Sequence, residues 1–219
     1  MPLFANPGSG RVCFHLFSSV TIRSSNAQKF QQLLNCSYST LPAYITHFEI
    51  GLNNDRFFIP RKSYMRLISR FHALRSLKLT HIAFPQNTLQ RCLKGFKTIS
   101  VLEILFVRLP TCGSLLDMLA ANRSLESVRL SEIYWKDLGN IPAPRSFQYL
   151  HSLSVHCEEN SQILSWLSKG SLPALSRSSI HARSGPQGEF LRKIGSSLQH
   201  LRVKMLVNRA LNLHEQNES

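Results

Sequence analysis

The sequence predicts an α/β fold in which short parallel strands alternate with helices along an array of repeats. Three observations predict it. A phrase of the form apolar-x-x-apolar-x-apolar occurs eight times, its starts lie 23 to 29 residues apart, and most intervals carry an apolar stripe with helical spacing. Because successive side chains of a strand point to opposite faces, each phrase would bury one face of a strand and leave the other open.

The phrases run through nearly the whole chain and mark the expected strands. They cover residues 17–22, 45–50, 74–79, 99–104, 125–130, 150–155, 175–180 and 198–203. The phrase at 175–180 carries Ser178 in its middle apolar place. Each phrase alternates apolar and polar residues at its end, as a half-buried strand does, and we expect strands of about five residues.

The intervals between the phrases hold the expected helices. Their apolar stripes consist of Ala27, Phe30, Leu33 and Leu34; Tyr64, Leu67, Ile68 and Phe71; Leu89, Leu93 and Phe96; Leu115, Leu116 and Leu119; Ile163, Leu164 and Leu167; and Phe190, Leu191 and Ile194. The interval after Leu130 is the exception, because the segment from Asn140 to Arg145 contains too many prolines for a long helix.

A strand followed by a helix of about ten residues matches the leucine-rich repeat, whose period is roughly 20–29 residues. The pattern therefore predicts a leucine-rich-repeat solenoid, a ribonuclease-inhibitor-like horseshoe with parallel strands on its concave side and helices on its convex side. We expect about eight irregular units of about 25 residues over 14–207, a flexible segment at 1–13 and a polar tail at 208–219. The alternative is a doubly wound α/β domain, which would need strands that are apolar almost throughout.

Three longer phrases resemble the region that follows the F-box in F-box-like proteins of basidiomycete fungi. They are Leu-Phe-Ser-Ser-Val-Thr-Ile at 16–22, Leu-Arg-Ser-Leu-Lys-Leu-Thr-His-Ile-Ala-Phe at 74–84 and Leu-Glu-Ser-Val-Arg-Leu-Ser-Glu-Ile-Tyr-Trp at 125–135. The resemblance spans about 14–205 and rests on repeat phrasing. It implies a non-enzymatic module that recruits protein substrates to a cullin ubiquitin ligase, with a Skp-type adaptor as partner only where an F-box lies upstream.

The chain departs from that family in two ways. The first phrase starts at residue 17 and leaves no room for the helical F-box, so ligase docking is not carried over to any residue. Leucine-rich repeats also place Asn or Cys three residues after the phrase, where the side chain satisfies loop backbone groups. That place holds Ile82, Val107, Ile133 and Glu158, and only Asn53 keeps the expected type. We therefore expect an irregular solenoid without a continuous asparagine ladder.

The candidate partner-binding residues lie at the strand positions that alternate with the apolar ones. Toward the C-terminal end these positions combine small hydroxyls with basic and imidazole side chains. The candidates are Arg129, His156, Arg177, His181, His200, Arg202 and Lys204. Arginine and lysine among serines suit an acidic or phosphorylated segment of a protein target. The alternative is a solvated sheet face that binds nothing.

The charge suggests a second class of partner. The formal net charge is +14, and residues 1–110 hold 14 basic and 3 acidic side chains. A basic helical surface could attract nucleic acid or another polyanion. The residues concerned are Arg61, Lys62, Arg66, Arg70, Arg91, Lys94 and Lys97. The sequence contains no RNA-binding motif and no zinc-finger spacing, which disfavours nucleic acid.

The sequence disfavours an enzyme, and we expect no cofactor and no metal. Gly8-Ser9-Gly10 lacks the lysine of a phosphate-binding loop, and none of the common hydrolase motifs is present. His156 and Cys157 are adjacent, so on a strand they would point to opposite faces, with the cysteine in the core. The five scattered cysteines are expected to be buried thiols.

No apolar run approaches the length of a membrane span, and Pro and Gly interrupt the N-terminus before a secretory signal could form. We therefore expect a cytoplasmic or nuclear protein. A third possibility is a truncated, non-functional fragment, since the repeat that starts at Phe17 has no obvious polar cap.

Overall fold

The computed structural model describes residues 18–23, 25–36, 39–51, 70–84, 98–157, 160–182 and 187–205. Its strands form one eight-stranded sheet in which every neighbouring pair is parallel and the spatial order equals the chain order. The strands are β1 (Ser19–Ile22), β2 (His47–Gly51), β3 (Ser76–Ala83), β4 (Val101–Thr111), β5 (Ser127–Asp137), β6 (Ser152–His156), β7 (Arg177–Ala182) and β8 (His200–Met205).

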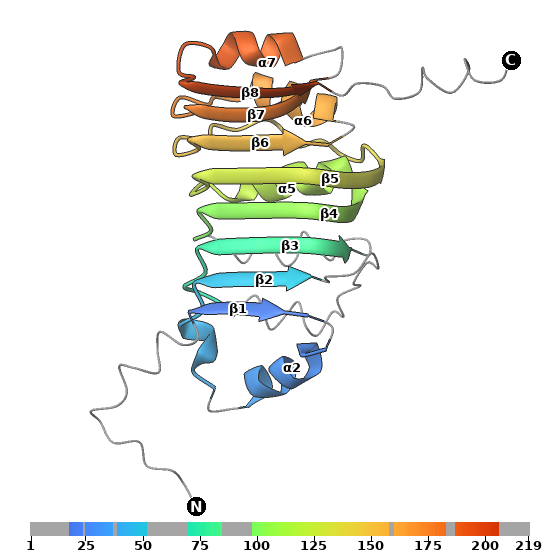
Figure 1. Cartoon of the computed structure of the whole chain (residues 1–219), viewed down its shortest axis with the longest axis vertical. Coiled ribbons are helices and arrows are strands. Elements are labelled where there is room, and N and C mark those ends of the chain that lie inside the picture. The colour runs from blue at the N-terminus through green and yellow to red at the C-terminus, as the bar shows by residue number, and fades with distance from the viewer. Residues whose placement is uncertain are drawn as a thin grey trace, which may run out of the picture.

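This order bears on the two architectures that the sequence allowed. Figure 1 shows the strands stacked one after another from β1 to β8. A doubly wound sheet reverses its strand order at a switch point, and this sheet does not. The fold is therefore an α/β fold with a single parallel sheet, and its strand order is compatible with a solenoid or horseshoe.

The described helices are α2 (Ala27–Asn35), α5 (Cys112–Ala121), α6 (Asn160–Lys169) and α7 (Gln187–Ile194), with a 3-10 turn η1 (Leu41–Ala43). Figure 1 shows α5 and α6 behind the sheet. As the prolines predict, no helix lies between β5 and β6. The expected stripe residues of α5 and α6 are all buried, but Leu33 of α2 is 55% exposed, so its place in the predicted stripe was wrong. The expected helices at 64–71 and 89–96 lie outside the described residues, apart from Arg70 and the buried Phe71.

The start of each strand from β2 to β8 uses the same hydrogen bonds. Two consecutive N–H groups donate to one carbonyl of the preceding unit. The accepting carbonyls belong to Ser18, Thr46, Arg75, Ser100, Glu126, His151 and Ser176. Side-chain hydroxyls add hydrogen bonds just before the strands begin. Thr98 donates to the carbonyl of Leu74 (2.7 Å), and Ser124 donates to the carbonyl of Ile99 (2.9 Å). Each of the eight phrases therefore contributes one strand of the sheet, and the strands from β2 to β8 start in the same way.

Three strands are much longer than the length of about five residues that was expected. β3 has 8 residues, and β4 and β5 have 11 each. In each of them one residue after the phrase has a positive φ: His81 (53°), Phe106 (53°) and Glu132 (51°). A left-handed residue interrupts the alternation, so two consecutive side chains face outward before a buried one follows. The chain then continues as a strand in the same sheet, which a count of apolar residues does not reveal.

The extension explains why the asparagine place is apolar. Ile82, Val107 and Ile133 are at most 3% exposed and pair with one another in register. Their backbone groups belong to the continuing sheet ladder, so no polar side chain is needed to satisfy them. The expected absence of an asparagine ladder holds for these three units, and Asn53 and Glu158 lie outside the described residues.

The remaining expectations have mixed outcomes. Cys112 and Cys157 are buried, but Cys36 is exposed at the end of α2, so its expected burial was wrong. Cys13, Cys92 and the terminal segments 1–13 and 208–219 lie outside the described residues. Ser178 is buried in the middle apolar place of β7, where its hydroxyl has no hydrogen-bond partner. No helix in the described ranges is long and apolar enough to cross a membrane.

Candidate partner-binding face

One face of the sheet lies opposite α5 and α6, and we call it the open face. It carries three phrase positions per strand, and on β2 to β7 these alternate with buried positions. On β8 the alternating Leu201 and Val203 are 47% and 41% exposed, so their expected burial was wrong. Every one of these positions is at least partly exposed along β1 to β8, as the alternation predicts. Figure 1 views the sheet from this side.

The seven predicted partner-binding residues lie together on β5 to β8 of the open face, and we call them the basic patch. Register arranges this part of the sheet in three rows. The rows are Ser127, Ser152, Arg177 and His200; Arg129, Ser154, Ser179 and Arg202; and Ser131, His156, His181 and Lys204. The serine side chains between the basic ones are short, so they leave space above the sheet. A segment that crosses the strands would meet a cation within one or two strand spacings of about 4.8 Å each.

Acidic side chains divide the open face into two parts. In the middle row, Glu49, Lys78, Glu103 and Arg129 follow one another in register over β2 to β5. The Nζ of Lys78 lies 2.9 Å from a carboxylate oxygen of Glu49. On the described parts of β6, β7 and β8 there is no acidic residue. Arg177, Arg202 and Lys204 therefore have no carboxylate on their own or neighbouring strands, whereas Arg129 lies beside Glu103.

Two imidazoles lie side by side in the third row of the basic patch, on β6 and β7. The rings of His156 and His181 stack with centroids 4.4 Å apart, and Nε2 of His156 lies 2.8 Å from the hydroxyl oxygen of Ser179. Burial lowers the pKa of His156 to about 4, with further lowering by His181, Lys204, Arg129 and Arg202. Burial also lowers the pKa of His181, and Lys204 adds to this while Glu132 opposes it. Both rings are therefore neutral at pH 7, and arginine and lysine supply the charge.

The adjacent Cys157 does not form a nucleophile–base pair with His156. Cys157 is 1% exposed, while His156 lies on the open face. Burial raises the pKa of the Cys157 thiol to about 12, so the reactive thiolate is suppressed at neutral pH. Among the described residues, no group of three or more His, Cys, Asp or Glu could hold a metal ion.

Of the residues in the polyanion hypothesis, only Arg70 is described. Its Nη1 donates to the carbonyl of Leu34 at 3.1 Å, close to the C-terminal end of α2. This side chain therefore has a structural partner. The other six residues, Arg61, Lys62, Arg66, Arg91, Lys94 and Lys97, lie outside the described residues.

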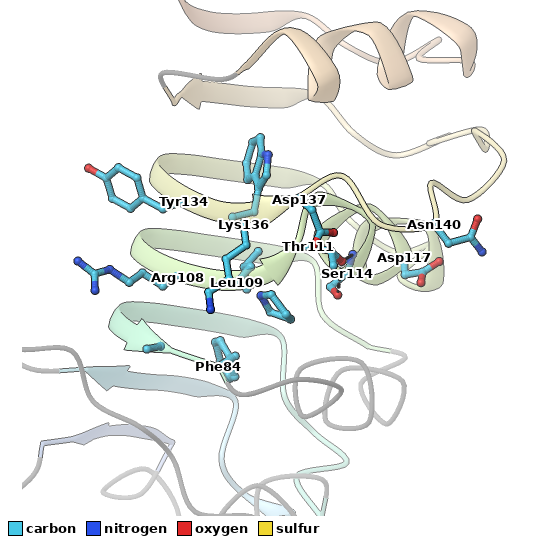
Figure 2. A pocket seen from close by; sticks show the side chains of 13 residues that line it. Phe84, Arg108, Leu109, Thr111, Ser114, Asp117, Tyr134, Lys136, Asp137 and Asn140 are labelled. Carbon is cyan, nitrogen blue, oxygen red and sulfur yellow. Dashed lines mark hydrogen bonds between the residues drawn. The ribbon is translucent and has the colours of Figure 1, made fainter.

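A pocket of about 770 Å³, which no sequence pattern indicated, lies at the carboxyl ends of β3 to β5. Figure 2 shows Arg108 and Tyr134 extending to one side of it, and Thr111, Ser114 and Asp137 lying together near the start of α5 on the other. Thr111 caps this helix, since its Oγ1 accepts from the backbone N–H of Ser114 at 3.1 Å. The lining includes two cations, Arg108 and Lys136, and two carboxylates, Asp117 and Asp137. This balance gives the pocket no preference for one sign of charge.

The open face also carries a feature that the sequence did not indicate. Phe106 is 42% exposed, and its ring stacks on that of His81 with centroids 4.7 Å apart and planes 5° apart. The positive φ of both residues places them beside the ordinary open-face positions. The feature that marks this site is a non-glycine residue with a left-handed backbone, which recurs in neighbouring units. The sequence pattern does not reveal the φ angle, so it could not predict the stack.

Comparison of the chain with family models, with curated proteins and with solved structures finds no match.

Proposed function

We propose that the chain is a leucine-rich-repeat protein-interaction module that binds an acidic or phosphorylated segment of a protein target through the basic patch. In this proposal the open face is the concave side of the solenoid. The module acts in the cytoplasm or nucleus without an enzymatic step of its own. The resemblance of the repeat phrases to fungal F-box-like proteins supports a role in selecting substrates for a ubiquitin ligase.

One observation carries the proposal: on β6 to β8 the open face gathers cations among short serine side chains, and the described parts of these strands hold no carboxylate. Arg177, Arg202 and Lys204 come from two strands and share no carboxylate on β6, β7 or β8. Arginine donates up to five hydrogen bonds in a fixed geometry that matches carboxylate and phosphate groups. The short serine side chains leave space for a bound segment above the sheet.

The test is the affinity for a fluorescein-labelled hexaglutamate peptide, measured by fluorescence anisotropy, with a hexaglutamine peptide as the uncharged comparison. We expect the protein to bind hexaglutamate and not hexaglutamine. The double variant Arg177→Glu with Arg202→Glu should weaken binding about a hundredfold, because each lost charge-assisted hydrogen bond costs about 1.5 kcal/mol, or about tenfold.

The matched control reverses two other exposed arginines, Arg123→Glu with Arg145→Glu. These residues line a separate hollow with Gln148 and Tyr149 and are not on the open face. The control changes the net charge by the same amount, so it should weaken binding only slightly. Equal losses in the two double variants would show that net charge alone attracts the peptide, and the basic patch would then be rejected as the site.

A further inference from the structure

The open face is apolar at one strand. Among its phrase positions, β4 alone presents large apolar side chains, Val101 and Leu105, while the other strands present polar residues or glycine there. Val101 and Leu105 are half-buried, whereas Phe106, which follows Leu105, is 42% exposed. We call Val101, Leu105 and Phe106 the apolar stripe. It lies next to β5, where the basic patch begins with Arg129.

The exposure of Phe106 has a backbone cause that carries a cost. Its φ of 53° is in the left-handed region, which costs a non-glycine residue about 1–2 kcal/mol. Burying the ring would offset that cost, yet the ring stays on the surface, supported on one side by His81. The same φ at His81 and Glu132 continues their strands, but of the three residues only Phe106 carries a large apolar side chain there. The ring is 42% exposed, so a partner's apolar side chain could bury more of it.

The charges around the apolar stripe restrict the kind of partner. Glu103 lies within the stripe on β4, and Glu132 follows it on β5, where its carboxylate accepts from the hydroxyl of Tyr134 at 3.1 Å. A continuous polyanion would place negative charge against these carboxylates. A protein segment with an apolar end and a separate acidic end would avoid them and match both parts of the face.

Strand spacing fixes the distance between the two ends. β4 is three strands from β7 and four from β8. At about 4.8 Å per strand these separations are about 14 Å and 19 Å, and an extended chain rises about 3.3 Å per residue. A segment that crosses the strands would therefore reach the cations of β7 and β8 about four to six residues from its apolar end.

We propose that the target segment carries a large aromatic or aliphatic residue, which packs on Leu105 and Phe106, and acidic or phosphorylated residues four to six positions away, which pair with the cations of β7 and β8. This inference rests on the proposed function and adds the second contact and its spacing. Large aromatic and arginine contacts are those that dominate protein recognition.

The test uses three fluorescein-labelled heptapeptides in the same anisotropy assay. They are Trp-Gly-Gly-Gly-Glu-Glu-Glu, its reverse Glu-Glu-Glu-Gly-Gly-Gly-Trp, and Gly-Gly-Gly-Gly-Glu-Glu-Glu. In each of the three peptides the label is attached at the acidic end. At least one tryptophan peptide should bind about tenfold more tightly than the peptide without tryptophan. Both directions are included because the geometry does not favour either.

The variant Phe106→Asn removes the ring and keeps a residue that tolerates a left-handed backbone. It should abolish the advantage of tryptophan while leaving the affinity for the glycine peptide unchanged. Tyr149→Asn is the matched control, because Tyr149 is a 61% exposed aromatic residue away from the open face. That variant should bind all three peptides as the unmodified protein does.

The possible failures are distinct. If the glycine peptide binds but tryptophan adds nothing, or if its advantage survives Phe106→Asn, the apolar contact is overturned and the basic patch stands. If none of the acidic peptides binds, the proposed function and this inference are overturned together.

Discussion

The long strands β3 to β5 and the short strands β6 to β8 use one repeat phrase in two different ways. In the long strands a left-handed residue follows the phrase, the sheet ladder continues, and the open face combines acidic, basic and apolar side chains. β6 ends at His156, one residue after its phrase. The open face of β6 to β8 presents hydroxyls, imidazoles and cations, with no carboxylate on the described parts of these strands. The same local pattern thus produces strands with additional pairing at β3 to β5 and strands with a basic open face at β6 to β8.

The comparison separates stability from binding. The contacts of β3 to β5 are mostly internal: a paired ladder, buried Ile82, Val107 and Ile133, and an ion pair between Lys78 and Glu49. Those of β6 to β8 leave Arg177, Arg202 and Lys204 free of carboxylates along these three strands. Substitutions in the first region should therefore change mainly the free energy of unfolding, and substitutions in the second mainly the affinity for a partner.

The largest expected effect is on the stability of the long strands. Val107 is fully buried in the extension of β4, and Val107→Asn would place an amide among apolar side chains where the backbone is already paired. We expect the free energy of unfolding to fall by about 3 kcal/mol, measured by urea denaturation. Lys136→Asn, at an exposed position of β5, should change it by less than about 0.5 kcal/mol. If Val107→Asn left the free energy of unfolding unchanged, backbone groups in the extension of β4 would have to be unpaired and available to the new amide.

The second expected effect compares two arginines of one row. Arg129 lies beside Glu103, whereas Arg202 has only serine across the neighbouring strand. Arg202→Ala should weaken binding of hexaglutamate about tenfold, and Arg129→Ala only about twofold to threefold, because Glu103 already offsets the charge of Arg129. The two variants are compared by fluorescence anisotropy at one salt concentration. If Arg129→Ala weakened the affinity more than Arg202→Ala did, the binding site would lie on the long strands β3 to β5 instead of the short ones.

The smallest expected effect concerns pH. His156 keeps a pKa of about 4 in the folded protein, against about 6.5 in an unfolded chain. The unfolded state therefore binds more protons between these values, and the free energy of unfolding should decline as the pH falls from about 6.5 toward 4. His156 is partly exposed, so its share should be less than one full proton.

Urea denaturation between pH 7 and pH 4.5 measures that dependence. The variant His156→Gln should show a shallower decline than the unmodified protein, because it removes one of the two histidines with a lowered pKa. His200→Gln, at an exposed position of the same face, is the control and should leave the slope nearly unchanged. Identical slopes for all three proteins would exclude His156 as the source of the pH dependence.

The sequence alone determined where the strands begin, which phrase positions lie on the open face and which residues make up the basic patch. These follow from a period of two residues within each phrase and from a nearly constant spacing between phrases, both of which are local. The proline-rich interval from Asn140 to Arg145 likewise excluded a helix through a local restriction on the backbone.

The tertiary structure decided which residues of different repeat units lie next to one another. The left-handed residues His81, Phe106 and Glu132 belong to chain segments that continue as strands because a neighbouring strand is present to pair with. The stack of His156 on His181, the lowered pKa of both rings and the place of Arg129 beside Glu103 all join residues from different units. Pairing, burial and charge act through space, so a pattern within one repeat cannot specify them.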